Sequence, residues 1–354
     1  MSKLIRFPGL IDIHVHLRDP GQTHKEDFFT GTKAALAGGV TTVFDMPNNN
    51  EPILTEKLLR EKNEIAKQKA LCDYGLYFGT DGNNINEFEN VSNKVIGLKI
   101  YLNMTTGKLA IEDEGKINKV FKSWQKNKVI VVHAENEMIG YALDLCRKYG
   151  NKLHITHISK RKDLEEIIDV KRLNLPVTCD VTPHHLFLTN KDGENLNGLL
   201  QVKPELQNQS DVDYLWDNLS KIDCIASDHA PHTLEEKKAF DPPSGLPELD
   251  TMLPLLYTAV RQKRLSTTDL IRLTNTSPQK IFDYKQDKNT YVELDPDEEF
   301  QIENKSLYTK CGWSPYHGWK VYGKIKRVYI RSQKVFEDGE LLIKAGSGRN
   351  ICYN

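Results

Sequence analysis

Two histidines separated by a single residue, His14 and His16, are the clearest chemical feature of the sequence. They end an apolar run at 10–16 that has the length and composition of a β-strand. Side chains two residues apart on a strand point to the same side, so both imidazoles can face one metal ion. Such a pair is more often structural when it stands alone, and its interpretation as a metal site therefore depends on further ligands.

Further residues that could bind or bridge metal ions follow other strand-like runs. Lys99 lies within one run, His133 and His157 end two others, and Asp228 follows the last. In a barrel of parallel strands the active site lies at the carboxyl ends of the strands. We therefore expect these side chains to converge there with the first two histidines, although His133 or His157 alone would more often be structural.

Lys99 is the unusual member of this group, because a divalent cation repels an ammonium. A lysine carbamylated by CO₂ is different, since the carbamate is anionic and has two oxygens that can bridge two metal ions. The sequence does not show this modification. The alternative is a lysine whose ammonium pairs with Asp228.

Eight short apolar runs rich in β-branched residues recur through the first two thirds of the chain. They lie at 10–16, 40–46, 72–79, 95–102, 129–134, 153–158, 176–181 and 222–226. The gaps mostly have apolar residues at helical spacing, as at 56–70, 114–127, 137–149 and 162–173. Eight strand–helix units predict a (β/α)8 TIM barrel. The rival, a doubly wound open sheet, does not need eight regular units, and no GxGxxG follows the first strand.

The first helix has both a start and a stop pattern. Thr23 and Glu26 have the spacing of a capping box ahead of Phe28. Gly38 and Gly39 follow the helical pattern and are typical of a helix end. We therefore expect Thr23 and Glu26 to cap this helix.

The sequence changes in character after about residue 289. Short runs at 291–294, 299–302, 320–321, 325–330 and 334–336 are typical of antiparallel strands, and Asp338-Gly339 is typical of a turn. We expect these runs and the first few residues to form a small β-rich layer beside the barrel. The prediction is thus a catalytic barrel at 9–288 and a flanking β-rich domain made of 1–8 and 289–354.

The bulk composition excludes several classes of protein. Apolar residues make up 39% and charged residues 27% of the 354, which excludes collagen-like and largely disordered chains. A net charge of −1 does not favour binding to nucleic acid. Six scattered cysteines without a CxxC pair indicate reduced thiols. No apolar run is long enough for a signal peptide or a membrane span, so we expect a cytoplasmic protein without membrane partners.

Several segments resemble the amidohydrolase superfamily. They are DIHVHLRDPG at 12–21, MPN at 46–48, GLKIY at 97–101, HAE at 133–135, TH at 156–157, PHH at 183–185 and SDHAPH at 227–232. More closely, the chain resembles the dihydroorotase family, and within it the dihydroorotase domain of the animal multifunctional pyrimidine-synthesis protein. The resemblance runs from residue 3 to about 338.

The resemblance implies a zinc-dependent enzyme with two Zn²⁺ per subunit. It assigns His14, His16 and Asp228 to one zinc, His133 and His157 to the other, and N6-carboxylated Lys99 to both. A hydroxide bridging the metals would be the nucleophile, and Asp228 the general acid and base. The implied reaction is the reversible cyclisation of N-carbamoyl-L-aspartate to L-dihydroorotate plus water, a step of pyrimidine (UMP) synthesis.

Arg18 is the best evidence for the substrate that the sequence offers. It lies two residues beyond His16, so we expect it to face the same rim. A guanidinium binds a carboxylate through two parallel hydrogen bonds, and neutral hydantoin or allantoin rings do not need one. The alternative is a salt bridge from Arg18 to Asp19 or Asp12.

The resemblance adds further substrate contacts. It assigns the substrate α-carboxylate to Arg18 together with Asn48 and His232, for which turn or capping roles are equally open. It also implies a mobile lid at 104–107 whose Thr105 hydrogen-bonds the substrate. The loop at 241–245 is expected to wall the pocket.

The chain departs from the animal domain at a few positions. Where that domain has Cys-His before its ligand on the sixth strand, this chain has Thr156-His157, and where that domain has glutamate, this chain has Asp180. Those positions help to hold a third zinc in the animal domain, so we expect two metals here. The second lid residue is Thr106 instead of an aromatic residue. Lys203 replaces an arginine and cannot make the same planar contact, which leaves its assignment to the substrate open.

Two alternatives to an active dihydroorotase follow from the resemblance. One is another cyclic amidohydrolase, such as a hydantoinase or allantoinase, against which Arg18 argues. The other is an inactive homologue that acts as a scaffold, for example for aspartate transcarbamoylase, although such relatives usually lose metal ligands. We expect a homodimer with carbamoyl aspartate and dihydroorotate as ligands, and aspartate transcarbamoylase is the partner that the resemblance suggests.

Overall fold

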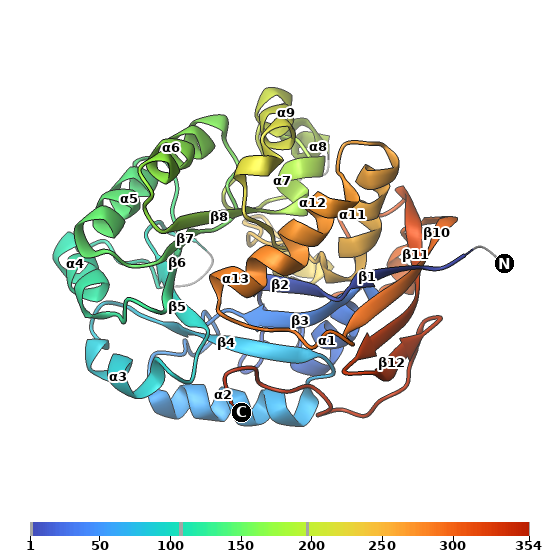
Figure 1. Ribbon diagram of the computed structural model, residues 1–354, viewed down its shortest axis with the longest axis horizontal. Helices are drawn as coiled ribbons and strands as arrows, with labels where there is room; N and C mark the ends of the chain where they lie inside the picture. Colours follow the sequence, from blue (N-terminus) through green and yellow to red (C-terminus); the bar gives the residue numbers. More distant parts are fainter. Residues whose placement is uncertain (1–2, 106–108, 196–197, 354) are drawn as a thin grey trace.

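Eight parallel strands form the centre of the computed structural model, which describes residues 3–105, 109–195 and 198–353 (Figure 1). They are β2 (Leu10–Val15), β3 (Val40–Asp45), β4 (Asp73–Gly79), β5 (Gly97–Tyr101), β6 (Val129–His133), β7 (Leu153–Ile155), β8 (Val177–Val181) and β9 (Cys224–Ile225). The strands pair in chain order from β2 to β9. A parallel bridge between Val15 and His229 then joins the two ends of the sheet, so the predicted barrel is confirmed.

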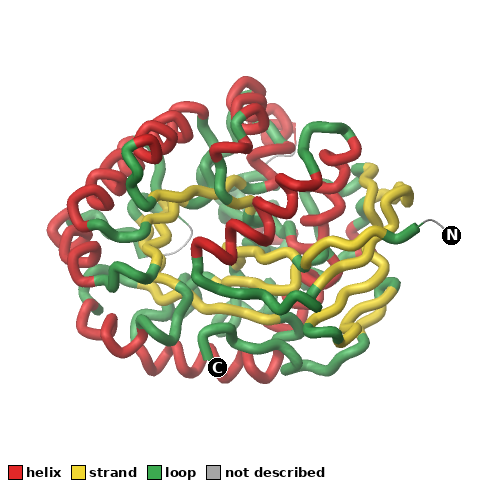
Figure 2. Tube along the Cα trace, viewed as in Figure 1, coloured by secondary structure: helices red, strands yellow, loops and turns green. Residues whose placement is uncertain are grey.

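Helices cover the outside of this barrel, as Figure 2 shows. They include α1 (Phe28–Ala37), α2 (Glu56–Lys69), α3 (Phe88–Val91), α4 (Glu114–Ser123), α5 (Glu137–Tyr149), α6 (Arg161–Arg172), α9 (Gln209–Asp217), α11 (Met252–Arg261), α12 (Thr267–Ile271) and α13 (Ser277–Ile281). Short helices α7 (Pro183–Phe187), α8 (Asn190–Asn195) and α10 (Leu234–Lys237) lie in the loops after β8 and β9. Apolar side chains pack between strands and helices, and a second cluster that includes Ile11, Phe44 and Tyr77 fills the barrel interior.

The start of α1 differs from the prediction. The capping residue is Asp27, whose side chain accepts a hydrogen bond from the backbone N–H of Thr30, so the expected cap by Thr23 and Glu26 is wrong. Glu26 is not available for a cap of that kind, because its buried carboxylate accepts hydrogen bonds from the distant segment at 309–310. Tertiary contacts have therefore moved the helix start.

A second, antiparallel sheet lies beside the barrel. Its strands pair in the order β1 (Ile5–Pro8), β10 (Tyr291–Gln301), β11 (Lys320–Ile330), β12 (Gln333–Glu337) and β13 (Glu340–Leu341). The predicted runs at 291–294 and 299–302 belong to one strand, β10, with an irregularity in its pairing with β11. The rings of Phe7 and Tyr257, 6.0 Å apart between centroids, join this sheet to α11. The expected β-rich layer and its first strand are thus confirmed.

None of the helices in the described part of the chain is both long and apolar enough to cross a bilayer. All six cysteines are free thiols, and four of them are buried.

Candidate active site

His14, His16 and Asp228 meet at the carboxyl ends of β2 and β9. Nε2 of His14 lies 3.2 Å from Oδ1 of Asp228, and Nε2 of His16 lies 3.1 Å from the same oxygen. The ligand atoms of the three residues all lie within 4.8 Å of one another. Imidazole nitrogens and a carboxylate oxygen at this spacing are a donor set for a transition metal such as zinc.

His133, His157 and Lys99 lie directly beside this group. The rings of His14 and His157 are 5.4 Å apart between centroids, and Nδ1 of His133 lies 2.8 Å from Nε2 of His157. Nζ of Lys99 lies 3.4 Å from the hydroxyl oxygen of Thr156, which is itself 3.0 Å from Nε2 of His157. Lys99 does not form the alternative ion pair, because Asp228 contacts the two histidines instead. The structure therefore brings all six predicted ligands together.

Two buried carboxylates hold the ends of these strands in place. Asp12 accepts hydrogen bonds from the backbone N–H groups of His14, at 3.1 Å, and Ser227, at 3.1 Å, and so joins β2 to the turn after β9. Asp180 accepts one from the backbone N–H of His157 at 2.6 Å, and its other oxygen lies 2.8 Å from Nε2 of His154. Asp12 therefore fixes the backbone of His14 and Asp180 the backbone of His157, which are both predicted ligands.

The histidines of the site are suited to bind a cation. Burial lowers the pKa of His14, His133 and His157, which keeps these imidazoles neutral at physiological pH. Within the described residues, the buried Nδ1 atoms of His14 and His157 have no hydrogen-bond partner. Such lone pairs are costly to bury unless something satisfies them. The donor set therefore fits a bound metal ion.

Two further groups of the site have shifted pKa values. Burial lowers the pKa of Lys99 to about 8, so a substantial fraction of this amine is uncharged at physiological pH. Burial alone would raise the pKa of Asp228, but the hydrogen bond and charge of His16, with smaller contributions from His184 and Lys99, hold it below its ordinary value. Asp228 is therefore ionised at physiological pH.

Arg18, a residue that is 5% exposed, lines the same pocket. It donates to the carbonyl oxygen of Pro231 at 3.2 Å, and its Nη2 lies 3.0 Å from Nε2 of His232. The alternative salt bridges are not formed, because Asp19 pairs with Lys69 at 2.7 Å and Asp12 accepts backbone hydrogen bonds. Among the residues that the structure describes, no carboxylate pairs with the guanidinium, and a buried cation that lines a pocket in this way is suited to bind an anionic ligand.

The other predicted substrate residues have different places. Asn48 lines the pocket, and its side-chain oxygen lies 2.6 Å from Nδ1 of His16. Thr105 and Lys203 line the pocket mouth, where Nζ of Lys203 donates to the carbonyl oxygen of Met104 at 3.3 Å. His232 is fully buried behind Arg18. The rest of the predicted lid, 106–107, lies outside the described residues.

Two polar side chains of the pocket, those of His184 and Tyr101, had no role in the prediction from the sequence. The buried side chain of His184 lines the pocket, with Nδ1 3.2 Å from a carboxylate oxygen of Glu248. Tyr101, at the end of β5, lines it as well. The segment PHH at 183–185 was the sequence signal that could have pointed to His184. The loop at 241–245 does contribute to the pocket wall, through Ser244 and Gly245.

Comparison with known proteins agrees with this geometry. Residues 5–288 match the amidohydrolase family. The chain belongs to the amidohydrolase family. It is 41% identical over 372 residues to the dihydroorotase of Pyrococcus abyssi, and the alignment covers 98% of this chain and 87% of that protein. Within the family, the chain therefore belongs with the dihydroorotases. It is 43% identical over 350 residues to the multifunctional protein CAD of Squalus acanthias, covering 99% of this chain but 16% of that much longer protein.

Solved structures of the family share the fold. The L-hydantoinase (dihydropyrimidinase) from Arthrobacter aurescens is similar with a TM-score of 0.93 and 26% identity, over 98% of this chain and 89% of that chain. An inactive dihydroorotase-like domain of a CAD-like multifunctional protein from Chaetomium thermophilum has a TM-score of 0.84 and 26% identity, over 99% of both chains. Because the same fold occurs in a domain described as inactive, activity must be argued from the side chains.

Proposed function

We propose that this chain is a zinc-dependent dihydroorotase, which interconverts N-carbamoyl-L-aspartate and L-dihydroorotate plus water in pyrimidine synthesis. The observation that supports this most strongly is one pocket in which a histidine–aspartate cluster lies beside the buried guanidinium of Arg18. The cluster supplies ligands for hydrolytic metal chemistry, and the guanidinium supplies a partner for the substrate carboxylate.

Two zinc ions per subunit would be held by the six residues of the cluster. His14, His16 and Asp228 would bind one ion, His133 and His157 the other, and carboxylated Lys99 both. Zinc, when bound, lowers the pKa of a coordinated water to about 7 and polarises a carbonyl oxygen. We propose two ions rather than three, because the carboxylate of Asp180 is already engaged by His154 and the backbone of His157.

Lys99 can be carboxylated because its amine is buried and has a lowered pKa. The uncharged nitrogen attacks the carbon of CO₂, a C–N bond forms, and one proton leaves to solvent. The product is a carbamate with one negative charge, which changes a repelled ammonium into an anionic ligand.

Asp228 is proposed as the general base and acid. Its carboxylate is ionised, so in the direction of hydrolysis it can take the proton of the attacking water. The same carboxyl can then give that proton to the departing amide nitrogen. In the direction of ring closure the two transfers run in reverse order.

Arg18 is proposed to bind the substrate α-carboxylate, with Asn48 beside it at the pocket wall. His232 stays a predicted ligand of the same carboxylate, although its position behind Arg18 favours a role in orienting the guanidinium. Thr105 and Lys203, at the mouth, are proposed to contact the substrate from the opposite side.

The partners of the chain are also a proposal. The shark relative is a multifunctional protein, of which this chain matches only 16%, and this supports the proposal that the chain works next to other enzymes of its pathway. Association with aspartate transcarbamoylase, a homodimer and a cytoplasmic location stay predictions.

An assay of L-dihydroorotate hydrolysis with and without a chelator, together with a zinc count on the same protein, tests the proposal. We expect activity that depends on about two zinc ions per chain and is lost on chelation. Dihydropyrimidine and hydantoin rings without a carboxylate serve as matched control substrates and should be poor. Zinc binding with preference for a neutral ring would instead support a hydantoinase, and a protein that purifies without stoichiometric zinc would support an inactive scaffold.

A further inference from the structure

The turn that presents Asp228 has a strained backbone. Asp228 has a φ of 47°, in the left-handed region that residues with a side chain rarely adopt. Such a conformation persists only where its surroundings hold it. Part of that support comes from the next residue, His229, whose carbonyl oxygen accepts a hydrogen bond from the backbone N–H of His16 at 2.8 Å.

The imidazole of His229 is oriented by two backbone amides. Its Nδ1 accepts hydrogen bonds from the N–H groups of Glu248, at 3.0 Å, and Leu249, at 3.3 Å. A nitrogen that accepts has no hydrogen, so the ring hydrogen is on Nε2. Nε2 lies 3.5 Å from Oε2 of Glu26, and both side chains are fully buried. Within the described residues, Nε2 has no hydrogen-bond partner, so Glu26 is the acceptor placed to receive it.

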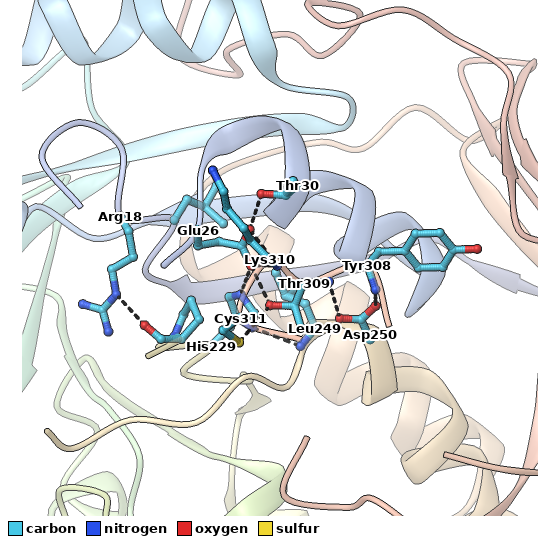
Figure 3. A network of polar contacts seen from close by, with 12 residues as sticks. Arg18, Glu26, Thr30, His229, Leu249, Asp250, Tyr308, Thr309, Lys310 and Cys311 are labelled. Carbon is cyan, nitrogen blue, oxygen red and sulfur yellow. Dashed lines mark hydrogen bonds and ion pairs between the residues drawn. The ribbon is translucent and has the colours of Figure 1, made fainter. Parts of the chain in front are cut away.

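Glu26 is itself fixed from several directions, as Figure 3 shows. Its Oε2 accepts a hydrogen bond from the hydroxyl of Thr309 at 2.6 Å, and the backbone N–H of Lys310 donates to the same oxygen at 3.2 Å. The hydroxyl of Thr30, in the first turn of α1, donates to the other oxygen. The carboxylate therefore connects the segment before α1, the segment at 309–310 and the turn after β9.

We propose that Glu26 is a positioning residue that acts through His229 to hold the turn presenting Asp228 to His14 and His16. Glu26 contacts neither the pocket nor the predicted ligands, so it does not take part in the chemistry directly. Its carboxylate fixes the tautomer and the orientation of His229, and the imidazole fixes the turn. The rival explanation is that Glu26 only fastens the segment at 309–310 to the barrel.

A double-mutant cycle separates the two explanations, and its catalytic half depends on the proposed function. In Glu26→Gln the size is kept and the charge removed. In His229→Asn the side-chain oxygen can still accept from the amides of Glu248 and Leu249, but the donor toward Glu26 is lost. Thr309→Val is the matched control, because it removes a neighbouring hydrogen bond to Glu26 without touching His229. Zinc affinity is measured by competition with a chelator, and kcat and KM with dihydroorotate.

We expect each of Glu26→Gln and His229→Asn to weaken zinc binding and lower kcat by about 10- to 100-fold, the usual cost of changing a group that supports a metal ligand. KM should change by less than about twofold, because the substrate contacts stay in place. The double variant should be no worse than the poorer single variant, since both changes break one connection. Thr309→Val should lower the melting temperature and cost much less zinc affinity and kcat than Glu26→Gln, because Thr30 and Lys310 still hold the carboxylate.

Additive losses in the double variant would overturn the proposal, as would a Thr309→Val protein that loses as much zinc affinity as Glu26→Gln.

If Glu26→Gln does not fold, a comparison of His229→Gln with His229→Asn tests the proposal instead, because the glutamine keeps a hydrogen-bond donor toward Glu26. His229→Gln should then bind zinc more tightly than His229→Asn, and the opposite order would contradict the proposal. A parent that binds zinc without hydrolysing dihydroorotate would refute the proposed function, while the zinc affinities would still test this inference.

Discussion

Arg18 is the residue on which the substrate assignment depends. Its guanidinium is buried and has no carboxylate partner within the described residues, so replacing it should remove an interaction made with the substrate. A hydrogen bond to a charged group contributes about 1.5–3 kcal/mol, which corresponds to about 10- to 100-fold in affinity. Arg18→Met should therefore raise KM for dihydroorotate by about that factor. Hydrolysis of a neutral dihydropyrimidine serves as the control, and an unchanged KM for dihydroorotate would argue against the assignment.

Asp228 should be needed for turnover and not for folding. A positioned acid–base group contributes about 10²- to 10⁴-fold, so Asp228→Asn should lower kcat by at least about 100-fold with little change in the melting temperature. Asp223, just before the start of β9, provides the control. Its carboxylate pairs with Lys171, so Asp223→Asn should affect stability but not kcat. Equal kcat values for Asp228→Asn and the parent would refute the proposed role.

The carboxylation of Lys99 should depend on pH. Only the uncharged amine reacts with CO₂, and with a pKa of about 8 its uncharged fraction rises steeply from pH 7 and levels off above pH 8 to 9. At constant dissolved CO₂, the initial rate at which isotope-labelled CO₂ is incorporated, followed by NMR, should follow this curve, and the signal should disappear in Lys99→Ala. An initial rate that continues to rise through pH 10 would indicate ordinary surface lysines.

The convergence of the proposed ligands could be predicted from the sequence because their positions are fixed by strand ends. His14, His133 and Asp228 follow apolar runs, and the carboxyl ends of parallel strands meet. Glu26 and His184 could not be placed in this way, since their neighbours come from loops far away in the chain. The position of His232 behind Arg18 depends on loop packing for the same reason.

At the scale of elements, the end of α1 supports the active-site turn. A Cβ on Gly38 would lie 1.7 Å from the carbonyl oxygen of Leu249, whose N–H group donates to His229. Gly38→Ala should therefore force the segment at 248–250 away and lower the free energy of unfolding by about 1–3 kcal/mol, measured by denaturant titration. Gly140→Ala, in α5, where the new Cβ would lie 3.9 Å from a carboxylate oxygen of Glu166, should instead stabilise the protein by about 0.5–1 kcal/mol. The same sign for both variants would contradict this account.

Strands were easier to predict than helix ends. The eight barrel strands are buried on both faces and therefore have a continuous apolar pattern. Helix ends depend on contacts outside the helix. The carboxylate of Glu26 accepts a hydrogen bond from the hydroxyl of Thr309, and Asp27 is the residue that caps α1. The predicted helix at 114–127 ends at Ser123, where the following Trp124 has an extended backbone and a buried side chain.

In the whole molecule the chain enters the antiparallel sheet twice, once before the parallel barrel and once after it. The chain passes from β1 of the antiparallel sheet into β2 of the barrel and returns to the first sheet in β10. The segment at 309–310 reaches back from this outer layer to the buried Glu26. The division into a barrel at 9–288 and a flanking domain made of 1–8 and 289–354 stays a prediction.

Side chains distant in the sequence are proposed to meet around a pair of metal ions. Anomalous X-ray scattering at the zinc edge, from crystals grown with zinc and bicarbonate, measures this directly. We predict two zinc peaks in the pocket, one beside His14, His16 and Asp228 and one beside His133 and His157, with a carboxylated Lys99 between them. A pocket without zinc, with an unmodified ammonium on Lys99, would contradict it.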